Sequence, residues 1–175
     1  MDGMQTWDAI RARRDVREFA DRRIADADLD RVLEAGRRSP SSRNWQPWDF
    51  VVVTDRAQLQ ELSRVWRGGG HVARSAATIA LVGPVLAGDD HRHGSLWYDL
   101  GQVSISIMVA AADLGIGSGH SAVADQDLAR IVLGLPPDRF CAHLIPLGYP
   151  AGRPLRPVER PDRRPFGEVV HRGRW

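Results

Sequence analysis

The spacing of apolar residues along the chain follows two periods, one typical of helices and one typical of strands. Helical spacing predicts helices at residues 4–13, 26–36, 55–65 and 96–114, and from Asp125 or Asp127 to residue 133. Short apolar runs rich in branched side chains predict buried strands at 48–54, 75–82 and 140–147. Asp26 and Asp55 stand just before helical patterns, so we expect both to cap helices. Helices and short strands alternate without an internal repeat, which predicts one domain over residues 1–175, of the α+β or α/β class.

Segment 96–114 is the longest apolar helix that the pattern predicts. Leu100, Val103, Ile107 and Ala111 recur at helical spacing, and few charged residues interrupt the segment. Most of its circumference should therefore be buried. In a chain of this length, such a helix is either a central core helix or part of an interface between two subunits.

The chain changes character from residue 151 onward. Prolines alternate with arginines up to Pro165, which prevents a regular helix before Phe166. Residues 151–175 form either a disordered tail or an extended C-terminal arm that lies on another surface. The apolar residues near the end favour the arm, because an apolar tip needs a surface on which to dock; they are Phe166, Val169, Val170 and Trp175.

Composition narrows the range of functions. No apolar run approaches the length of a membrane span, and the polar start does not resemble a secretory signal, so we expect a cytoplasmic protein. Cys141 is the only cysteine, which excludes an internal disulfide and any CxxC motif. All 24 basic residues are arginines. The absence of lysine excludes a Schiff-base lysine and a phosphate-loop lysine.

The charge of the chain is small overall but unevenly distributed. A net charge of +2 does not by itself argue for nucleic-acid binding. Arginines are concentrated in residues 11–23 and 153–174, so both ends of the chain are candidates for binding one anionic ligand. An arginine-rich nucleic-acid-binding module is a less favoured alternative, because no stacking platform accompanies the charge.

Two polar stretches are candidate ligand sites. Arg13, Arg14 and Arg17 follow the first predicted helix and can converge on one phosphate, although a solvated basic turn has the same composition. The stretch 39–48 carries hydroxyl and amide side chains suited to a heterocycle or a ribityl chain. Turn chemistry is the alternative, because the same residue types favour turns; these residues are Ser41, Ser42, Asn44 and Gln46.

Other motifs give weaker signals. The glycines of residues 115–119 allow close approach of the backbone to a ligand, but the stretch does not match GxGxxG and follows a helix. His91 and His93 lie beside acids, yet no third ligand stands at a known metal-site spacing. No GxSxG elbow accompanies Ser121. We therefore predict neither a metal site nor a catalytic nucleophile or acid–base residue.

Taken together, several stretches resemble the nitroreductase family of flavin enzymes, in the right order along the chain. Residues 13–19 (RRDVREF) resemble the family's opening Arg-Arg-Ser-x-Arg-x-Phe. Residues 39–48 (SPSSRNWQPW) are similar to its Ala-Pro-Ser-x-x-Asn-x-Gln-Pro-Trp. Residues 113–118 (DLGIGS), 145–150 (IPLGYP) and 163–171 (RRPFGEVVH) resemble its Leu-Gly-Leu-Gly-Ser, its Gly-Tyr-Pro strand end and its closing Arg-x-Pro-Leu-x-Glu-x-x-His.

The resemblance implies an α+β fold with a central mixed or antiparallel sheet flanked by helices, in an intertwined homodimer that binds two flavin mononucleotides (FMN). It implies that Arg13, Arg14 and Arg17 meet the phosphate and the polar edge of the ring, and that Arg164, with Arg163, returns to the phosphate. It assigns to the flavin of the other subunit Pro40, Ser41, Ser42 and Asn44. The backbone near the reactive edge of the ring would be that of Ser118, Gly119, His120 and Ser121. Asp15 departs from the family's usual serine, and an acid at a phosphate site lowers affinity unless it pairs with an arginine such as Arg14 or Arg17.

The implied activity passes hydride from NADH or NADPH through FMN to a small electrophilic acceptor, such as a nitroaromatic compound or a quinone. Such a protein needs no catalytic acid, since its task is positioning, electrostatics and control of water. The stretch between Gly68 and Ser95 is shorter than in longer family members, where an inserted segment covers the flavin. Because of this departure, the identity of the acceptor stays open. Two alternative functions also stay open: a deazaflavin-dependent reductase, and a flavin-binding store or sensor without turnover.

Overall fold

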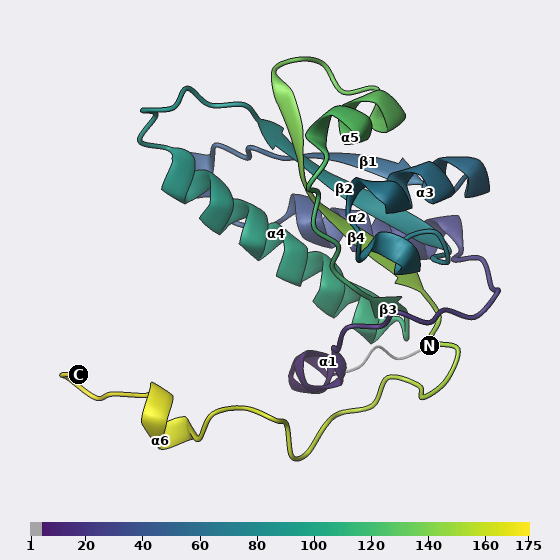
Figure 1. Ribbon diagram of the computed structural model, residues 1–175. Helices are drawn as coiled ribbons and strands as arrows, with labels where there is room; N and C mark the ends of the chain where they lie inside the picture. The colour runs from purple at the N-terminus through teal and green to yellow at the C-terminus, as the bar shows by residue number, and fades with distance from the viewer. Residues whose placement is uncertain (1–4) are drawn as a thin grey trace.

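A four-stranded sheet runs through the middle of the molecule, with its strands in the order β1-β2-β4-β3 and every pairing antiparallel (Figure 1). The strands are β1 (Asp49–Val53), β2 (Ala77–Pro84), β3 (Gly117–Ser118) and β4 (Arg139–Gly148). The helices are α1 (Thr6–Ala12), α2 (Asp26–Arg37), α3 (Arg56–Leu62), α4 (His93–Asp113), α5 (Gln126–Leu133) and α6 (Phe166–Val169). This computed structural model describes residues 5–175, so Met4, at which the first predicted helix begins, lies outside the described residues. The predicted α+β class with an antiparallel sheet is confirmed.

β2 lies at the centre of the sheet and is buried on both faces. Ile79 and Leu81 belong to one hydrophobic cluster, whereas Ala80 and Val82 belong to the other. Successive side chains of a strand point to opposite faces, so a strand covered on both sides needs apolar residues at successive positions. This requirement explains the continuous apolar run in the sequence.

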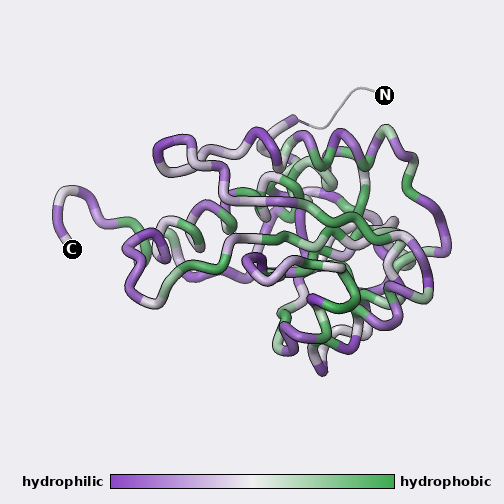
Figure 2. Tube along the Cα trace, turned by 90° about the horizontal axis from the view of Figure 1, so that it is seen from above, coloured by the Kyte–Doolittle hydropathy of each residue, from purple (hydrophilic) through white to green (hydrophobic). Residues whose placement is uncertain are grey.

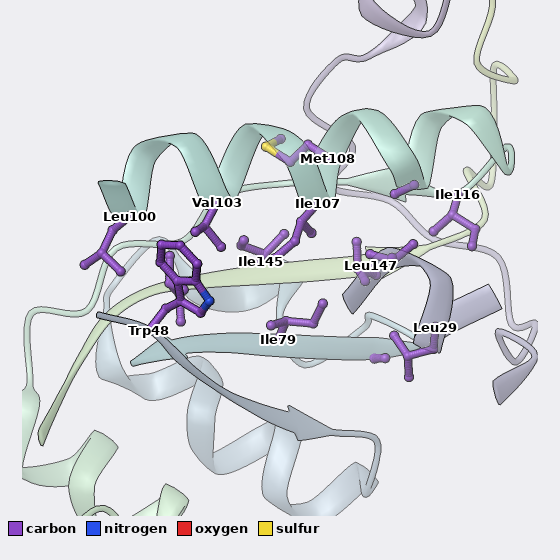
Figure 3. Packing of buried hydrophobic residues seen from close by; sticks show 14 of the residues in the cluster. Leu29, Trp48, Ile79, Leu100, Val103, Ile107, Met108, Ile116, Ile145 and Leu147 are labelled. Carbon is purple, nitrogen blue, oxygen red and sulfur yellow. The ribbon is translucent and has the colours of Figure 1, made fainter. Parts of the chain in front are cut away.

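α2 and α4 cover one face of the sheet and pack against each other (Figure 1). Leu100, Val103 and Ile107 of α4 lie over Ile145 and Leu147 of β4 (Figure 3). These side chains form the centre of the larger core cluster, which fixes α4 along the sheet. α4 therefore forms a wall for any groove beside β4.

α3 and α5 contribute to the core on the other face of the sheet. Asp55 caps α3 by accepting the backbone N–H of Gln58 at 2.8 Å, as predicted. Asp125 caps α5 by accepting the N–H of Leu128 at 2.8 Å, which identifies it, and not Asp127, as the cap. Each cap satisfies an N–H group that the first helical turn leaves without an intrahelical acceptor.

Two local predictions are wrong. Asp26 does not cap α2: the residue at the cap is Ala25, and Asp26 lies in the first turn, where it pairs with Arg23 at 2.7 Å. A carboxylate there still interacts favourably with the helix dipole. β1 is an edge strand whose only fully buried residue is Val53, because α3 and the core cover little of its outer half. Burial of a strand depends on its place in the sheet, which its own residues do not specify.

α4 is buried on one side only within the single chain. Its outward side carries the exposed residues Trp97 (53%), Tyr98 (71%) and Ile105 (47%). The prediction that most of its circumference is buried therefore does not hold for one chain alone. Of the two interpretations of this helix, the structure supports a core helix on its inner side, and its outer side presents an exposed apolar face.

The C-terminal residues extend away from the body of the molecule (Figures 1 and 2). The segment first follows the chain near α1, where the N–H of Ala151 donates to the carbonyl of Glu18 at 3.1 Å and that of Val158 to Arg11 at 3.2 Å. Beyond these contacts it continues past α1 to the exposed helix α6. None of the helices in the described part of the chain is long and apolar enough to cross a membrane.

Candidate functional site

A groove of about 560 Å³ lies between α4, β4 and the segments that follow α1 and β3. This volume is within the range of about 300–1,000 Å³ that is common for small-molecule sites. We call it the α4–β4 groove. It is lined by Arg13, Asp15, Leu81, Trp97, Leu100, Gly101, Ser104, Ile105, Met108, His120, Ala142 and His143. Arg13, Asp15 and His120, which lie far apart in the sequence and are all predicted site residues, meet here.

Backbone contact brings the arginine turn to the glycine-rich segment. The N–H of Val16 donates to the carbonyl of Ser118 at 2.8 Å. A Cβ atom at Gly117 would lie 2.7 Å from the Val16 side chain, and one at Gly119 would lie 2.8 Å from the Val16 carbonyl oxygen. Glycine at both positions therefore allows the two segments to pack this closely.

A β-bulge places two neighbouring residues of β4 in the groove. The register between β2 and β4 shifts between Leu81 and Val82, so that Leu81 pairs with His143 and Val82 with Cys141. Ala142 lies opposite the shift, and both Ala142 and His143 line the groove although they are adjacent in sequence. Bulges commonly redirect side chains in this way next to functional sites.

His120 and His143 form an aromatic pair in the groove, with ring centroids 5.0 Å apart and nearly perpendicular planes. Burial lowers the pKa of His143 below its ordinary value. Burial also lowers the pKa of His120, and His143 and Arg13 lower it further, while Asp15 acts in the opposite direction. Both imidazoles are therefore predominantly neutral near pH 7.

Asp15 pairs with the residue two positions before it. Its Oδ1 lies 3.4 Å from Nη1 of Arg13 and 3.9 Å from Nδ1 of His120. The expected arginine partner is therefore present, but it is Arg13 and neither Arg14 nor Arg17. This pairing partly neutralises an acid that would otherwise repel an anion bound at Arg13.

Backbone N–H groups after Ser118 are available to a ligand. Gly119 and Ser121 donate to β4, to the carbonyls of Pro146 at 3.0 Å and Leu144 at 2.9 Å. The N–H groups of His120, Ala122 and Val123, by contrast, donate to no acceptor within residues 5–175. Because partly buried N–H groups normally find a partner, this segment is suited to bind acceptor atoms of a ligand. We call residues 118–123 the donor turn.

The stretch 39–48 contributes to a different groove, on the outward side of α4. This second groove, also about 560 Å³, is lined by Pro40, Ser41, Ser42, Gly94, Ser95, Tyr98, Asp99 and Gln102. Asp99 of α4 is 1% exposed and accepts the N–H of Ser42 at 3.0 Å and the amide of Gln102 at 3.3 Å. The buried carboxylate therefore ties the loop to the helix.

The same loop holds an unusual backbone. Arg43, Asn44 and Gln46 have φ values of 51°, 57° and 53°, in the left-handed region. Each such non-glycine residue costs on the order of 1–3 kcal/mol, and such residues are concentrated at ligand-binding and catalytic sites. The N–H of Gln46 donates to Oγ of Ser41 at 2.9 Å, which helps to hold this shape. The strained backbone is typical of ligand-binding loops, whereas the bond between Ser41 and Gln46 is itself turn chemistry.

The remaining predicted residues do not converge within one chain. Arg14 donates a hydrogen bond to the carbonyl of Arg153, so it fastens the C-terminal segment, and Arg17 is exposed. Arg164 donates a hydrogen bond to the carbonyl of Glu168 at 3.1 Å, and Arg163 precedes it in the sequence, shortly before α6. The two arginine-rich ends meet near α1, but the guanidinium groups at 163–164 do not reach the α4–β4 groove.

Sequence reasoning missed three residues that shape the site: His71, Asp99 and His143. Asp99 was visible as a lone acid in an apolar helix, and His143 as a polar residue in an apolar strand. His71 carried no such signal. Its role becomes visible only through contact with His120, which is distant in the sequence.

The loop that contains His91 and His93 shows no metal-site geometry. Within the described residues, no group of three or more His, Cys, Asp and Glu side chains is arranged to hold a metal ion. Nε2 of His93 faces the carbonyl of Ala87 at 2.7 Å, and Asp90 pairs with Arg92 at 2.6 Å. These contacts are those of an ordinary polar loop.

A sequence profile described as the nitroreductase family matches residues 10–84, which include the arginine turn and the 39–48 loop. A relative in Archaeoglobus fulgidus, named for a proposed NADH dehydrogenase or NAD(P)H nitroreductase activity, is 31% identical over 172 residues, which cover 95% of this chain and 96% of the relative. The chain belongs to the nitroreductase family. An oxygen-insensitive NADPH nitroreductase of Salmonella typhimurium is 28% identical over an alignment that covers 97% of this chain and 74% of that protein.

Solved structures of other nitroreductase-fold proteins support the architecture. An FMN-dependent nitroreductase of Clostridium difficile superimposes with a TM-score of 0.82 at 22% identity, covering 95% of this chain and 98% of the other. An NADPH:FMN oxidoreductase of Vibrio harveyi also superimposes with a TM-score of 0.82, at 23% identity, and the match covers 95% of this chain and 76% of the other. The α+β nitroreductase fold that the motifs implied is confirmed.

Proposed function

We propose that this protein is an FMN-dependent oxidoreductase that uses NADH or NADPH to reduce a small electrophilic acceptor. One observation carries the proposal: Arg13 and Asp15 of the arginine turn meet His120 of the donor turn at the α4–β4 groove, and the N–H of His120 has no acceptor within residues 5–175. A flavin mononucleotide combines an anionic phosphate with a ring whose edge carries hydrogen-bond acceptors. The groove offers a matching cation, N–H donors and apolar walls.

The residues fit the parts of FMN in a specific way. Arg13, whose fork-shaped guanidinium suits phosphate, lines the groove, and within residues 5–175 its one carboxylate partner is Asp15. Trp97, Leu100 and Met108 supply apolar surface for an aromatic ring. Neutral His120 and His143 avoid the cost of placing two further charges in a groove of limited exposure.

Bound FMN would supply two-electron chemistry, accepting hydride from the nicotinamide and passing it to the acceptor. The chain's own contribution is to hold the ligand, exclude water and stabilise negative charge at the polar edge of the ring with N–H groups of the donor turn. No acid–base residue is required at the reacting atoms. The proposed acceptor is a nitroaromatic compound, a quinone or a similar small electrophile.

We further propose that the active unit is a homodimer formed through the outward face of α4. The apolar residues Trp97, Tyr98 and Ile105 are exposed there, and the face lies between the α4–β4 groove and the groove of Ser41 and Ser42. A two-fold axis beside α4 would bring Pro40, Ser41, Ser42 and Asn44 of one protomer to the flavin at the other's arginine turn. The arm at 151–175, with exposed Phe166 and Trp175, would then lie on the second protomer, and Arg163 and Arg164 would reach a phosphate there.

The test uses the purified protein. We expect a yellow protein whose released cofactor has the mass of FMN, and whose absorbance near the flavin maximum bleaches when NADH or NADPH is mixed with it anaerobically. A colourless protein that develops no flavin spectrum with added FMN refutes flavin binding. A yellow protein that neither nicotinamide bleaches is a store, a sensor or a deazaflavin-coupled reductase, and reduced deazaflavin separates the last from the others. Size-exclusion chromatography with light scattering tests the dimer.

A further inference from the structure

His71 is a buried histidine that lies behind the donor turn. It ends a short 3-10 helix, Gly69–His71, and is 3% exposed. Its ring is placed between two backbone carbonyls: Nδ1 lies 3.2 Å from the oxygen of Gly68, and Nε2 lies 3.0 Å from the oxygen of His120. The second contact joins residues that are 49 positions apart. This side-chain contact joins the 3-10 helix that precedes β2 to the donor turn.

The two contacts favour one position for the ring proton. A neutral imidazole carries a proton on one nitrogen only, and the other nitrogen then presents a lone pair. A lone pair facing a carbonyl oxygen is repulsive, and the repulsion is greater at the shorter distance. The neutral ring is therefore expected to carry its proton on Nε2 and to donate to His120.

This hydrogen bond holds the donor turn from the side opposite to β4. Gly119 and Ser121 bond to β4, so the peptide groups of His120 point away from β4. The carbonyl of His120 is held by His71, while its N–H has no acceptor within residues 5–175. The peptide plane that carries the His120 carbonyl also carries the N–H of Ser121, which bonds to Leu144, so His71 and β4 hold this plane from its two edges. Without the His71 donor, the plane is held from one edge only, and the neighbouring N–H groups of His120 and Ala122 lose part of their fixed direction.

We propose that His71 is a positioning residue for flavin binding: its Nε2–H holds the carbonyl of His120 and thereby directs the N–H groups of the donor turn toward the polar edge of the ring. This inference rests on the proposed placement of FMN at the donor turn. His71 itself does not touch the flavin. It acts through the backbone of the segment that does.

Two isosteric substitutions separate this role from simple core packing. The amide nitrogen of glutamine occupies roughly the place of Nε2, so His71→Gln retains a donor to His120. The amide nitrogen of asparagine occupies roughly the place of Nδ1, so His71→Asn retains a donor only toward Gly68. Both replace the ring by a smaller polar side chain, so a packing role predicts similar losses in the two variants.

The experiment compares the two full-length variants with the wild type. We expect His71→Gln to bind FMN within about threefold of the wild type and to give the same bound-flavin absorption spectrum, whereas His71→Asn should bind about tenfold more weakly, the effect of one hydrogen bond, with a shifted spectrum. The midpoint temperature of thermal unfolding without FMN should be lowered to a similar extent in both variants. Equal FMN affinities and spectra in the two variants refute the inference.

A second measurement does not depend on the variants folding. Long-range ¹⁵N–¹H correlation of the His71 ring in the wild-type protein distinguishes its two tautomers. An Nε2-protonated ring supports the inference, and an Nδ1-protonated ring overturns it. A wild-type protein that binds no FMN overturns the proposed function and this inference with it, whereas wild-type binding combined with equal losses in both variants overturns the inference alone.

Discussion

Removal of the Arg13 guanidinium is the most direct test of the α4–β4 groove. Arg13 follows α1 at its C-terminal end, and its side chain is 22% exposed, at the junction of this groove with an apolar groove between α1, α2 and α4. Its side-chain contact among the described residues is Asp15, at 3.4 Å. Most of its five N–H donors therefore point to no protein acceptor.

The size of the effect can be estimated from this geometry. A hydrogen bond to a charged group contributes about 1.5–3 kcal/mol, so Arg13→Ala should weaken FMN binding by about 10- to 150-fold. The substitution also leaves Asp15 without its cation, and an unpaired carboxylate near the phosphate adds repulsion. Both effects act in the same direction, so we expect a value in the upper half of this range at low ionic strength.

The assay is a titration of the apoprotein with FMN, followed by quenching of flavin fluorescence at two salt concentrations. Arg11→Ala is the matched control, because Arg11 is also on the α1 segment and pairs with Asp8 at 3.3 Å, but does not line the α4–β4 groove. Arg11→Ala removes the same charge, so it controls for the effect that a change in the protein's overall electrostatic potential has on FMN binding. If Arg11→Ala weakens FMN binding as much as Arg13→Ala does, the assignment of the phosphate to Arg13 is wrong.

The remaining predictions concern the arm, the donor turn and two buried groups. Arg164→Ala should weaken FMN retention in the dimer, and an unchanged dissociation constant would count against its return to the phosphate. Gly119→Ala places a Cβ atom 2.8 Å from the carbonyl oxygen of Val16, so the donor turn must shift. FMN affinity in the same titration should then fall by about tenfold or more, the effect expected for lost hydrogen bonds. Burial raises the pKa of Cys141 to about 12, so the native thiol should resist a thiol reagent at pH 8 and react only after unfolding; rapid labelling of the native protein would refute its burial. Burial lowers the pKa of His143, so the unfolded chain binds a proton more readily than the folded chain does. The stability that comes from keeping His143 neutral is complete above about pH 6.5 and is lost as the pH falls toward the folded-state pKa. The free energy of urea unfolding of His143→Gln should therefore depend less on pH between 5 and 7.5 than that of the wild type.

Much of the local structure followed from the sequence. The helical spacing predicted α4 almost to its ends, and Asp55 identified the start of α3 because a cap depends only on the next few residues. For α5 the sequence left Asp125 and Asp127 as alternatives, and the structure identifies Asp125 as the cap. The two-residue strand β3 and the edge position of β1 were not predicted, since both depend on pairing with strands far away in the sequence.

The candidate site divides in the same way. The arginine turn, the 39–48 loop and the glycine-rich segment are each local, and their order along the chain was enough to identify the nitroreductase family. That Asp15 pairs with Arg13, that Asp99 ties the loop to α4, and that His71 holds the carbonyl of His120 could not be predicted. These contacts depend on side-chain directions set by the packed core.

The sequence by itself therefore determined the fold class, the family and the segments that are proposed to contact a ligand, because those properties reside in apolar periodicity and short motifs. Only the tertiary structure decided that the arginine turn and the donor turn share one groove, while the 39–48 loop opens on the other side of α4. The physical reason is that α4 lies between them, fixed to the sheet by Leu100, Val103 and Ile107 (Figure 3). In the proposed homodimer, a second protomer would bring together the two halves of the proposed flavin site that a single chain holds apart.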